Sequence, residues 1–424
     1  MQCSYVARQP VFDADLGLVG YELFYRTADT PDAQFHDPSS ATTNVLGNLV
    51  VDFGFEALVD GRRAFLNVTR EFFEDGHYEA VDPERFVLEL AATPAGDAAL
   101  LSALHRARID GYTVALDGFT DADPAQRYLL DEVDMVKIDA SGPSSTGLIA
   151  HAEWLRQRDL TLVAQRVETV DQFEACRLLG FDLFQGYFFA QPAVMTRSTL
   201  SPDRMVAARL LVELNRPDAD ARAIADVLRM DPGLTYRLLA LINSSFYGLR
   251  SRVESIPQAV MLLGIGTIRN FASVLALSGL QAKPDELAVM ALARARMCEL
   301  VAQRMMRSEA PTAFTVGLLS MLDALLDLSL DEVVERLPVA ERLREALLGR
   351  TGPLGDLLSQ VEAYERDGAP VGDPRSRIPL DVLSTAYLDA VAWADQVRHA
   401  LGPTTASRRA INPFRTPATL SRRS

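Results

Sequence analysis

The chain has 424 residues, of which 48% are hydrophobic, and carries a formal net charge of −15. Its length predicts two or three domains of ordinary size. The acidic balance argues against general nucleic-acid binding, because that binding draws its affinity from the neutralisation of phosphates by basic side chains.

The apolar runs and the cysteines favour a cytoplasmic protein. No apolar run reaches the roughly 18 residues that a membrane-spanning helix needs. The first 17 residues lack a basic region followed by a long apolar stretch, so they are not expected to be a signal peptide. The three cysteines, Cys3, Cys176 and Cys298, are too far apart to indicate a disulfide framework or a zinc site.

Short β-type runs alternate with helical patterns over the first 200 residues. The runs span 18–26, 64–68, 86–90, 113–117, 135–139, 161–165 and 183–187. The gaps between most of them leave room for one helix, which is the rhythm of a parallel α/β sheet. Because no GxGxxG loop is present, this rhythm favours a closed (β/α)8-type barrel over an open dinucleotide-binding fold.

Most of these runs carry a polar residue near the C-terminal end. They are Glu22, Asn67, Glu89, Asp117, Lys137, Asp139, Gln165 and Gln185. Polar side chains are unfavourable in buried strands unless they are partnered. In an α/β barrel the C-terminal strand ends meet at one mouth, where active sites are built. The series therefore predicts a polar site at the mouth, although each residue alone could simply begin a solvated loop.

Four of these residues suit a divalent cation. Glu22, Asn67, Glu89 and Asp117 offer three carboxylates and an amide oxygen, the ligands preferred by Mg²⁺ or Mn²⁺. Lys137 is one of only two lysines among 42 basic residues. A compact ammonium suits a place beside a phosphate or a metal-bound water. Asp117 is followed by Gly118, which also reads as a hairpin turn.

The pattern becomes helical from about residue 201. Apolar residues three and four apart occur in 220–230, 233–245, 257–264, 267–280 and 285–306. Asp231 before Pro232 and Ser255 before Ile256-Pro257 are candidate N-caps. Gly264 and Gly266 separate two of the helices. We expect an all-α domain over 199–398.

The last residues, 399–424, form a third region. Residues 1–200 carry 15 basic and 31 acidic side chains, whereas 401–424 carry five arginines and no acid. This segment is short, polar and rich in helix breakers, so we expect a disordered basic tail.

The first 195 or so residues resemble the EAL domain of cyclic di-GMP phosphodiesterases. The resemblance rests on segments in the family's order: "ELFYR" for Glu-Ala-Leu-Leu-Arg, then "LNV", "LEL", "ALDGF", "VKID", "AQRVET" and "QGYFFAQP". It implies that Glu22, Asn67, Glu89 and Asp117 match the ligands of one metal ion. It also places Gln9, Arg26, Lys137, Glu168 and Gln185 near the nucleotide pocket, with Lys137 and Glu168 as remnants of the catalytic set.

Three positions depart from the family pattern. Gly118 stands where the family has a second aspartate, a ligand of its second metal. Gln165 replaces the first glutamate of Ala-Glu-Gly-Val-Glu, and a neutral amide cannot serve as an anionic ligand or base. Ala92 replaces a loop-bracing glutamate. Together these losses imply an inactive phosphodiesterase, because two-metal hydrolysis depends on both cations.

Residues 201–330 resemble the HDOD domain, mainly through the segment 230–272. No histidine lies between His151 and His399, and Ser320-Met321 stands where an HD-type hydrolase would carry its histidine-aspartate pair. We therefore expect no HD-type hydrolytic site and a role in protein–protein interaction. The segment 242–248, "INSSFYG", is either a partner surface or a helix C-terminus that ends at Gly248.

These observations predict a signal-transduction protein with a degenerate EAL barrel over 1–198, an HDOD domain over 199–398 and a tail. The barrel is expected to act as a sensor of cyclic di-GMP or as a scaffold, with no DNA or membrane partner. Two alternatives stay open. One is an active or weakly active phosphodiesterase in which Asp121, Asp123 or Asp139 supplies the missing ligand. The other is a ligand-free barrel that serves as a dimerisation platform.

Overall fold

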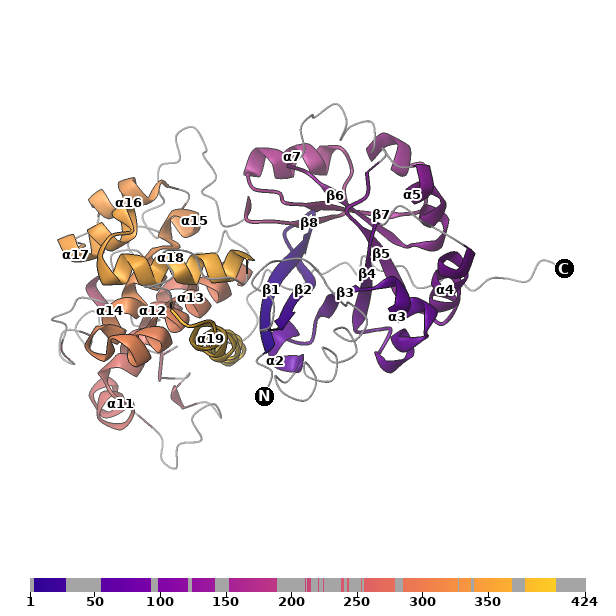
Figure 1. Cartoon of the computed structure of the whole chain (residues 1–424). Helices are drawn as coiled ribbons and strands as arrows, with labels where there is room; N and C mark the ends of the chain where they lie inside the picture. Colours follow the sequence, from indigo (N-terminus) through magenta and orange to yellow (C-terminus); the bar gives the residue numbers. More distant parts are fainter. Residues whose placement is uncertain are drawn as a thin grey trace. The chain divides into compact units, whose positions relative to one another are not determined.

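The computed structural model describes residues 4–27, 55–92, 98–120, 124–141, 152–188, 255–278, 285–326, 328–336, 339–367 and 378–401, together with isolated residues between 210 and 253. The chain divides into two compact units, one formed by Met1–Phe189 and the other by Ala190–Thr405. The first contains a β-barrel and the second is helical (Figure 1). Among the described helices, none is long and apolar enough to cross a bilayer.

Eight strands pair in chain order and close into a barrel. Figure 1 labels these strands. They are β1 (Ser4–Asp13), β2 (Leu18–Thr27), β3 (Arg63–Val68), β4 (Phe86–Ala91), β5 (Thr113–Asp117), β6 (Met135–Asp139), β7 (Thr161–Gln165) and β8 (Leu183–Gln185). Neighbouring strands from β2 to β8 are parallel, whereas β1 runs antiparallel to both β2 and β8. The predicted barrel is confirmed, with one inverted strand.

The inverted strand β1 is absent from the predicted set of strands. A tight turn joins it to β2, in which the Asp13 carboxylate accepts hydrogen bonds from the backbone N–H groups of Asp15 (2.9 Å) and Gly17 (2.7 Å). A side chain at Gly17 would collide with that carboxylate, because an added Cβ would lie 2.6 Å from it. A register shift between Val11 and Phe12 leaves Val19 without a partner in the ladder.

Helices cover the outside of the barrel between the strands. They are α2 (Phe55–Val59), α3 (Arg70–Glu74), η1 (His77–Ala80), α4 (Ala98–Ile109), α5 (Pro124–Leu129), η2 (Leu130–Glu132) and α7 (Val170–Leu178). α7 begins with a capping box, in which Thr169 accepts from the N–H of Gln172 and the Gln172 side chain accepts from the N–H of Thr169. This exchange satisfies two backbone groups that a helix start otherwise leaves unpaired.

The barrel interior is filled by one apolar residue from each of seven strands. They are Val11, Phe65, Val87, Ala115, Met135, Val163 and Leu183, and Val19 of β2 packs against them. All seven are at most 2% exposed, so this layer is a packed core that closes the barrel below its mouth.

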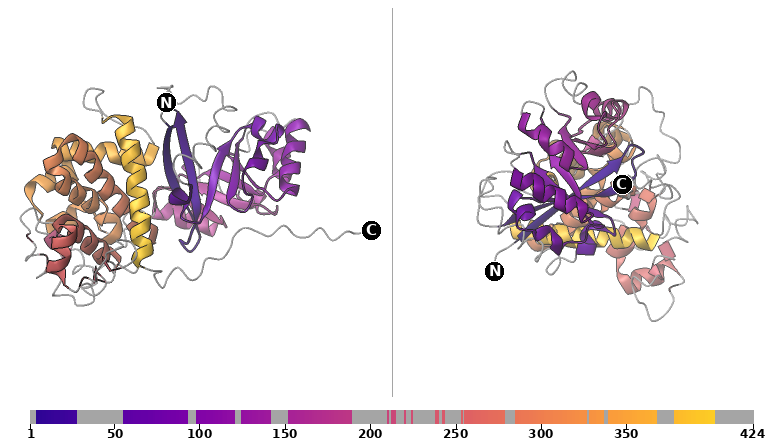
Figure 2. Two further views of the ribbon diagram at one scale, coloured as in Figure 1. Left: turned by 90° about the horizontal axis from the view of Figure 1, so that it is seen from below. Right: turned by 90° about the vertical axis from the view of Figure 1, so that its right-hand side faces the viewer.

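The helical unit contains α11 (Ile256–Leu263), α12 (Ile265–Ser278), α13 (Asp285–Met305), η4 (Arg307–Glu309), α14 (Ala310–Leu319), α15 (Leu322–Leu326), α16 (Leu330–Arg336), α17 (Glu341–Arg344), η5 (Glu345–Gly349), α18 (Gly352–Asp367) and α19 (Leu380–Leu401). α13 packs against α14, α18 and α19. Figure 2 shows this unit from two further directions, with α19 in yellow.

The helix signals in the sequence are confirmed where the structure describes them. The Ser255 side chain caps α11 by accepting from the N–H of Gln258, and Gly264, with φ of +82°, ends that helix. α13 and α14 approach closely at Gly317, where an added Cβ would lie 2.8 Å from the Cα of Ala295.

Several predictions fall on residues that the structure leaves undescribed. The cap at Asp231 and the segment 244–248 lie outside the described residues, and so does the predicted boundary between 198 and 199. α19 continues to Leu401, so the predicted tail begins with three helical residues, and the rest of it is outside the described part.

Candidate ligand site at the mouth of the barrel

The polar residues of the strand ends follow the apolar core layer by two positions. Asn67, Glu89, Asp117, Lys137, Gln165 and Gln185 come two residues after Phe65, Val87, Ala115, Met135, Val163 and Leu183, respectively. Side chains two apart on a strand point to the same face. The polar set therefore forms the next layer inside the barrel, toward the C-terminal strand ends.

Two further residues join this layer from the N-terminal hairpin. Gln9 precedes Val11 by two positions, and it lies at the same end of the barrel because β1 is antiparallel. Glu22 of β2 follows Val19 by three positions rather than two. The register shift beside Val19 accounts for the difference. An extra residue in one strand moves every later side chain of that strand to the opposite face of the sheet.

Lys137 lies at the centre of this layer. Its ammonium nitrogen Nζ donates to Glu22 Oε2 at 2.8 Å and to Glu89 Oε1 at 2.6 Å, and it lies 4.0 Å from Asp117 Oδ1. Glu22 is 3% exposed, Glu89 0% and Lys137 1%. The structure thus brings together three of the four predicted metal ligands around a single buried ammonium.

Glu22 is the most heavily bonded carboxylate of the mouth. Besides Lys137, it accepts from Asn67 Nδ2 at 2.8 Å on Oε1 and from Gln185 Nε2 on Oε2. Gln185 Nε2 also donates to Gln9 Oε1 at 2.8 Å. The fourth predicted metal ligand, Asn67, and two predicted pocket residues are therefore connected to Glu22 by hydrogen bonds.

The two buried glutamates respond differently to the same ammonium. Burial works to raise the pKa of Glu22, but Lys137 and the amides of Gln185 and Asn67 hold that pKa below its ordinary value. Burial and the charge of Glu22 raise the pKa of Glu89 well above its ordinary value, despite Lys137. Burial disfavours the charged form of Lys137, yet Glu22 and Glu89 outweigh it and raise the pKa of the ammonium.

Three buried oxygen atoms in the mouth accept no hydrogen bond. They are Glu89 Oε2, Asp117 Oδ1 and Gln185 Oε1. Buried acceptors are rarely left open, so these atoms fit a cation or a ligand donor. Within the described residues, however, no three Asp, Glu, His or Cys side chains are arranged to hold a metal ion. The donor chemistry fits Mg²⁺ or Mn²⁺, while the present arrangement is organised around Lys137.

The three departures from the family pattern lie beside this cluster. Gly118 has φ of +71° with open space where a Cβ would be. Gln165 ends β7, and the following Arg166 has a left-handed φ of +52° and pairs with Asp139 at 3.2 Å. Ala92 donates its backbone N–H to the carbonyl of Asp117 at 2.7 Å, so a backbone contact remains where a glutamate brace is absent.

The remaining predicted residues are placed less directly. Glu168 is exposed, and its backbone N–H donates to Gln172 Oε1 at 2.8 Å. Asp139 accepts from Ser141 and Arg166, so it is already engaged away from Lys137. The side chain of Arg26 and both Asp121 and Asp123 lie outside the described residues. Arg166 is missed by sequence reasoning because an arginine after the strand looks like an ordinary loop residue.

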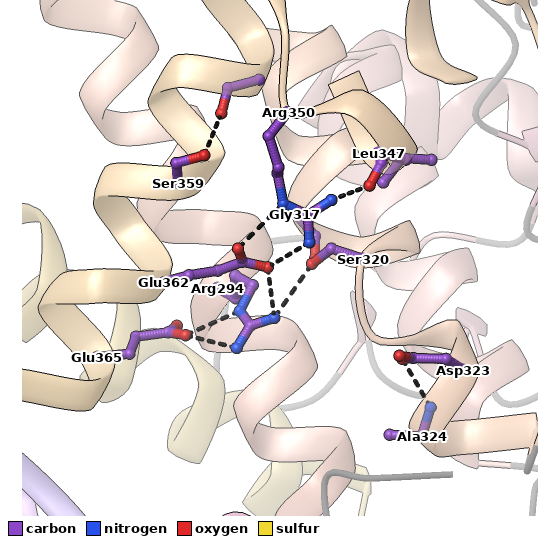
Figure 3. Close-up of polar contacts among 11 residues, drawn as sticks. Arg294, Gly317, Ser320, Asp323, Ala324, Leu347, Arg350, Ser359, Glu362 and Glu365 are labelled. Carbon is purple, nitrogen blue, oxygen red and sulfur yellow. Dashed lines mark hydrogen bonds and ion pairs between the residues drawn. The ribbon is translucent and has the colours of Figure 1, made fainter. Parts of the chain in front are cut away.

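The helical unit holds its own buried charge cluster, drawn in Figure 3. The guanidinium of Arg294 donates to Ser320 Oγ at 3.3 Å, to Glu362 Oε1 at 3.4 Å and to Glu365 Oε2 at 2.8 Å. Arg350 pairs with Glu362 at 2.8 Å. Ser320, at the position where we expect an HD-type hydrolase to carry its histidine-aspartate pair, thus accepts from the guanidinium of Arg294. The sequence gives no signal for this cluster, since its members are up to 71 residues apart.

Comparison with family models identifies two regions of the chain. A model described as "EAL domain" matches residues 63–192, and one described as "HDOD domain" matches residues 200–337. The first match begins at Arg63, so Glu22 and Arg26 lie before it. The second ends before α17, so Glu362 and Glu365 lie beyond it.

Two curated proteins are similar over most of their length. "Cyclic di-GMP phosphodiesterase CdgJ" of Vibrio cholerae is 32% identical over 374 residues, which cover 86% of each chain. "Uncharacterized protein YuxH" of Bacillus subtilis is 29% identical over 405 residues, covering 93% of this chain and 99% of that protein. Among solved structures, the PaMucR phosphodiesterase in complex with cyclic di-GMP is 23% identical, with a TM-score of 0.36, over 43% of this chain and 94% of that one.

Proposed function

The chain belongs to the family in which an EAL domain is followed by an HDOD domain, and on that premise we propose that its barrel is a cyclic di-GMP sensor with little or no hydrolytic activity. The observation that carries the proposal is the mouth of the barrel. It keeps two buried carboxyl groups, Glu22 and Glu89, beside the partly exposed Asp117, but Gly118 stands where the second metal would need its aspartate.

Several polar groups of the barrel mouth support the binding of cyclic di-GMP. Glu89 Oε2, Asp117 Oδ1 and Gln185 Oε1 are buried acceptors without donors. One Mg²⁺ or Mn²⁺ ion at Glu22, Asn67, Glu89 and Asp117 would offset the negative charge that otherwise repels an anionic dinucleotide. Arg26 and Gln9 would then contact the phosphates and bases, in keeping with the fit of a guanidinium to phosphate oxygens.

We expect slow hydrolysis because the barrel mouth lacks a ligand for the second metal ion. A two-metal site stabilises both the attacking and the leaving oxygen of a phosphodiester, and losing one ion removes half of that clamp. Gln165 is neutral and cannot replace an anionic ligand. Asp139 already accepts from Arg166, which leaves it poorly placed to serve as the missing ligand.

We propose that the helical unit passes the signal from the barrel to other proteins. An HD-type hydrolase needs histidine and aspartate at its metal, and here Ser320 faces the guanidinium of Arg294 instead. Residues 152–398 contain no histidine, so we expect no HD-type metal site there and propose that this unit binds protein partners.

Two measurements test the sensor proposal on the full-length protein. Cyclic di-GMP is titrated calorimetrically in the presence of Ca²⁺, and we expect binding that Arg26→Ala weakens at least tenfold. The protein is then incubated with cyclic di-GMP and Mn²⁺, and we expect no linear product by chromatography. If linear product forms and Glu22→Ala abolishes its formation, the proposal that the barrel is inactive is wrong. A titration that releases no heat would favour a ligand-free dimerisation platform.

A restoration experiment asks whether the three departures cause the inactivity. We expect the triple variant Gly118→Asp, Gln165→Glu, Ala92→Glu to gain cyclic di-GMP hydrolysis that the parent lacks. Its matched control keeps Gly118 and carries only the other two changes, so it still lacks the second-metal ligand. Equal rates in both variants would show that Gly118 is not the limiting position.

The second candidate is a working phosphodiesterase. The Vibrio cholerae relative, 32% identical over most of the chain, carries that activity in its name. In this case the first-metal ligands and Lys137 would be sufficient for turnover, and the hydrolysis assay separates this candidate from the sensor.

A further inference from the structure

We propose that Lys137 is the resident counter-cation of the barrel mouth and competes with divalent metal for Glu22 and Glu89. The proposal rests on the proposed function in one respect, namely that the mouth is a metal site. It adds that a residue of the chain itself sets the metal affinity, so that the mouth stays folded and neutralised when metal is scarce.

The contacts of the ammonium support this role. Lys137 Nζ donates to Oε2 of Glu22 at 2.8 Å and to Oε1 of Glu89 at 2.6 Å, which are oxygens of two of the metal ligands. The third carboxylate, Asp117, lies within ion-pair distance at 4.0 Å. The ammonium therefore occupies the point toward which the ligand oxygens converge.

The open acceptors show what a metal ion would gain. Oε2 of Glu89 and Oδ1 of Asp117 are buried and accept no hydrogen bond, so Lys137 satisfies only part of the oxygen set. Three carboxyl groups surround one ammonium, and Lys137 donates hydrogen bonds to only two of them, Glu22 and Glu89. A divalent cation would satisfy more of these oxygen atoms than the ammonium does. To bind, it would have to compete with the positively charged Lys137 for Glu22 and Glu89.

The side chain is suited to this exchange. Lys137 is 1% exposed, so its repulsion of a second cation would be little screened by water. A lysine carries a compact charge on a flexible stem and can withdraw from one carboxylate while it keeps another. An arginine, which the chain uses nearly everywhere else, would hold both carboxylates in a rigid fork.

The test measures Mn²⁺ binding alone, without dinucleotide and without turnover. We expect the full-length Lys137→Met variant to bind Mn²⁺ at least tenfold more tightly than the wild type by calorimetry. Mn²⁺ should also raise its melting temperature by a larger amount. The control is Arg177→Met, which removes one positive charge from an exposed ion pair with Glu174 on α7 and should leave Mn²⁺ affinity unchanged.

A second pair of variants keeps the test valid if Lys137→Met does not fold. Glu89→Gln is compared with the double variant Lys137→Met, Glu89→Gln, in which both partners of one ion pair are removed together. We expect the double variant to bind Mn²⁺ at least tenfold more tightly than Glu89→Gln.

Equal or weaker Mn²⁺ binding after the loss of Lys137, or no binding by either member of a pair, would overturn the proposal. This experiment contains no dinucleotide, so its result does not depend on whether cyclic di-GMP binds. The two proposals can therefore be rejected independently of each other.

Discussion

Glu89 is fully buried and shares an ammonium with a second carboxylate, which makes its charge sensitive to pH. Burial and Glu22 raise its pKa well above the ordinary value of 4.5. A folded state with a raised pKa holds the proton more tightly than the unfolded chain. Its contribution to stability is therefore complete below about pH 4.5 and is lost as the pH rises through the raised value.

Glu89→Gln should remove this pH dependence. As the pH rises above about 4.5, we expect the variant to become progressively more stable relative to the wild type, because it has no proton to lose at this position. Urea unfolding at a series of pH values measures the difference. Glu174→Gln, at an exposed ion pair, is the control and should keep a constant difference. A parallel pH profile for Glu89→Gln and the wild type would contradict the expectation.

The backbone conformation at Gly118 determines how much stability is lost when an aspartate is introduced there. Its φ of +71° lies in the left-handed region, where an L-residue loses roughly 1–2 kcal/mol, but no atom lies within 4 Å of an added Cβ. Aspartate tolerates this region better than alanine because its side chain bonds locally to the backbone. We expect Gly118→Asp to lower the free energy of unfolding by about 1 kcal/mol, and Gly118→Ala by somewhat more, in urea titrations. A loss of more than about 3 kcal/mol in Gly118→Asp would show that the site had not been open.

At the scale of elements, the Arg294 cluster joins α13, the end of α14, the residue after η5 and α18. Removing one member of a buried ion pair leaves its partner charged and unpaired, which typically destabilises by about 3–5 kcal/mol. We expect Arg294→Met to lose that much in urea unfolding. Arg342→Met is the control, because Arg342 is 57% exposed in its pair with Glu309, and pairs with an exposed member contribute about 0–1 kcal/mol. Equal losses in the two variants would contradict the assignment.

Elements that follow a strict period were predictable, and those fixed by distant contacts were not. The seven predicted strands exist because their apolar residues fill the barrel interior, and the polar mouth follows from the same two-residue period except at Glu22, which the register shift in β2 places. β1 was missed because its alternation is interrupted by Arg8, Gln9 and Pro10. The pairing of Lys137 with Glu22, 115 residues earlier, depends on the closed barrel, which no local pattern encodes.

At the scale of the whole molecule, the two units each have a core of their own and differ in fold. Separate cores usually unfold as separate cooperative units. We expect calorimetry of the full-length protein to show two transitions. Arg294→Met should lower one of them, and Glu89→Gln should shift only the other as the pH is raised. A single transition that responds to both variants would show that the units unfold together.

The antiparallel placement of β1 has a consequence for synthesis on the ribosome. β1 pairs with β8, and Gln9 receives its hydrogen bond from Gln185, 176 residues later. Until β8 has emerged, the growing chain has an unclosed sheet whose outer strand exposes free backbone groups, a form that invites pairing with other chains. Nascent chains that stall before Gln185 should therefore aggregate or recruit chaperones, whereas chains that have passed it can close the barrel while the helical unit is still being made.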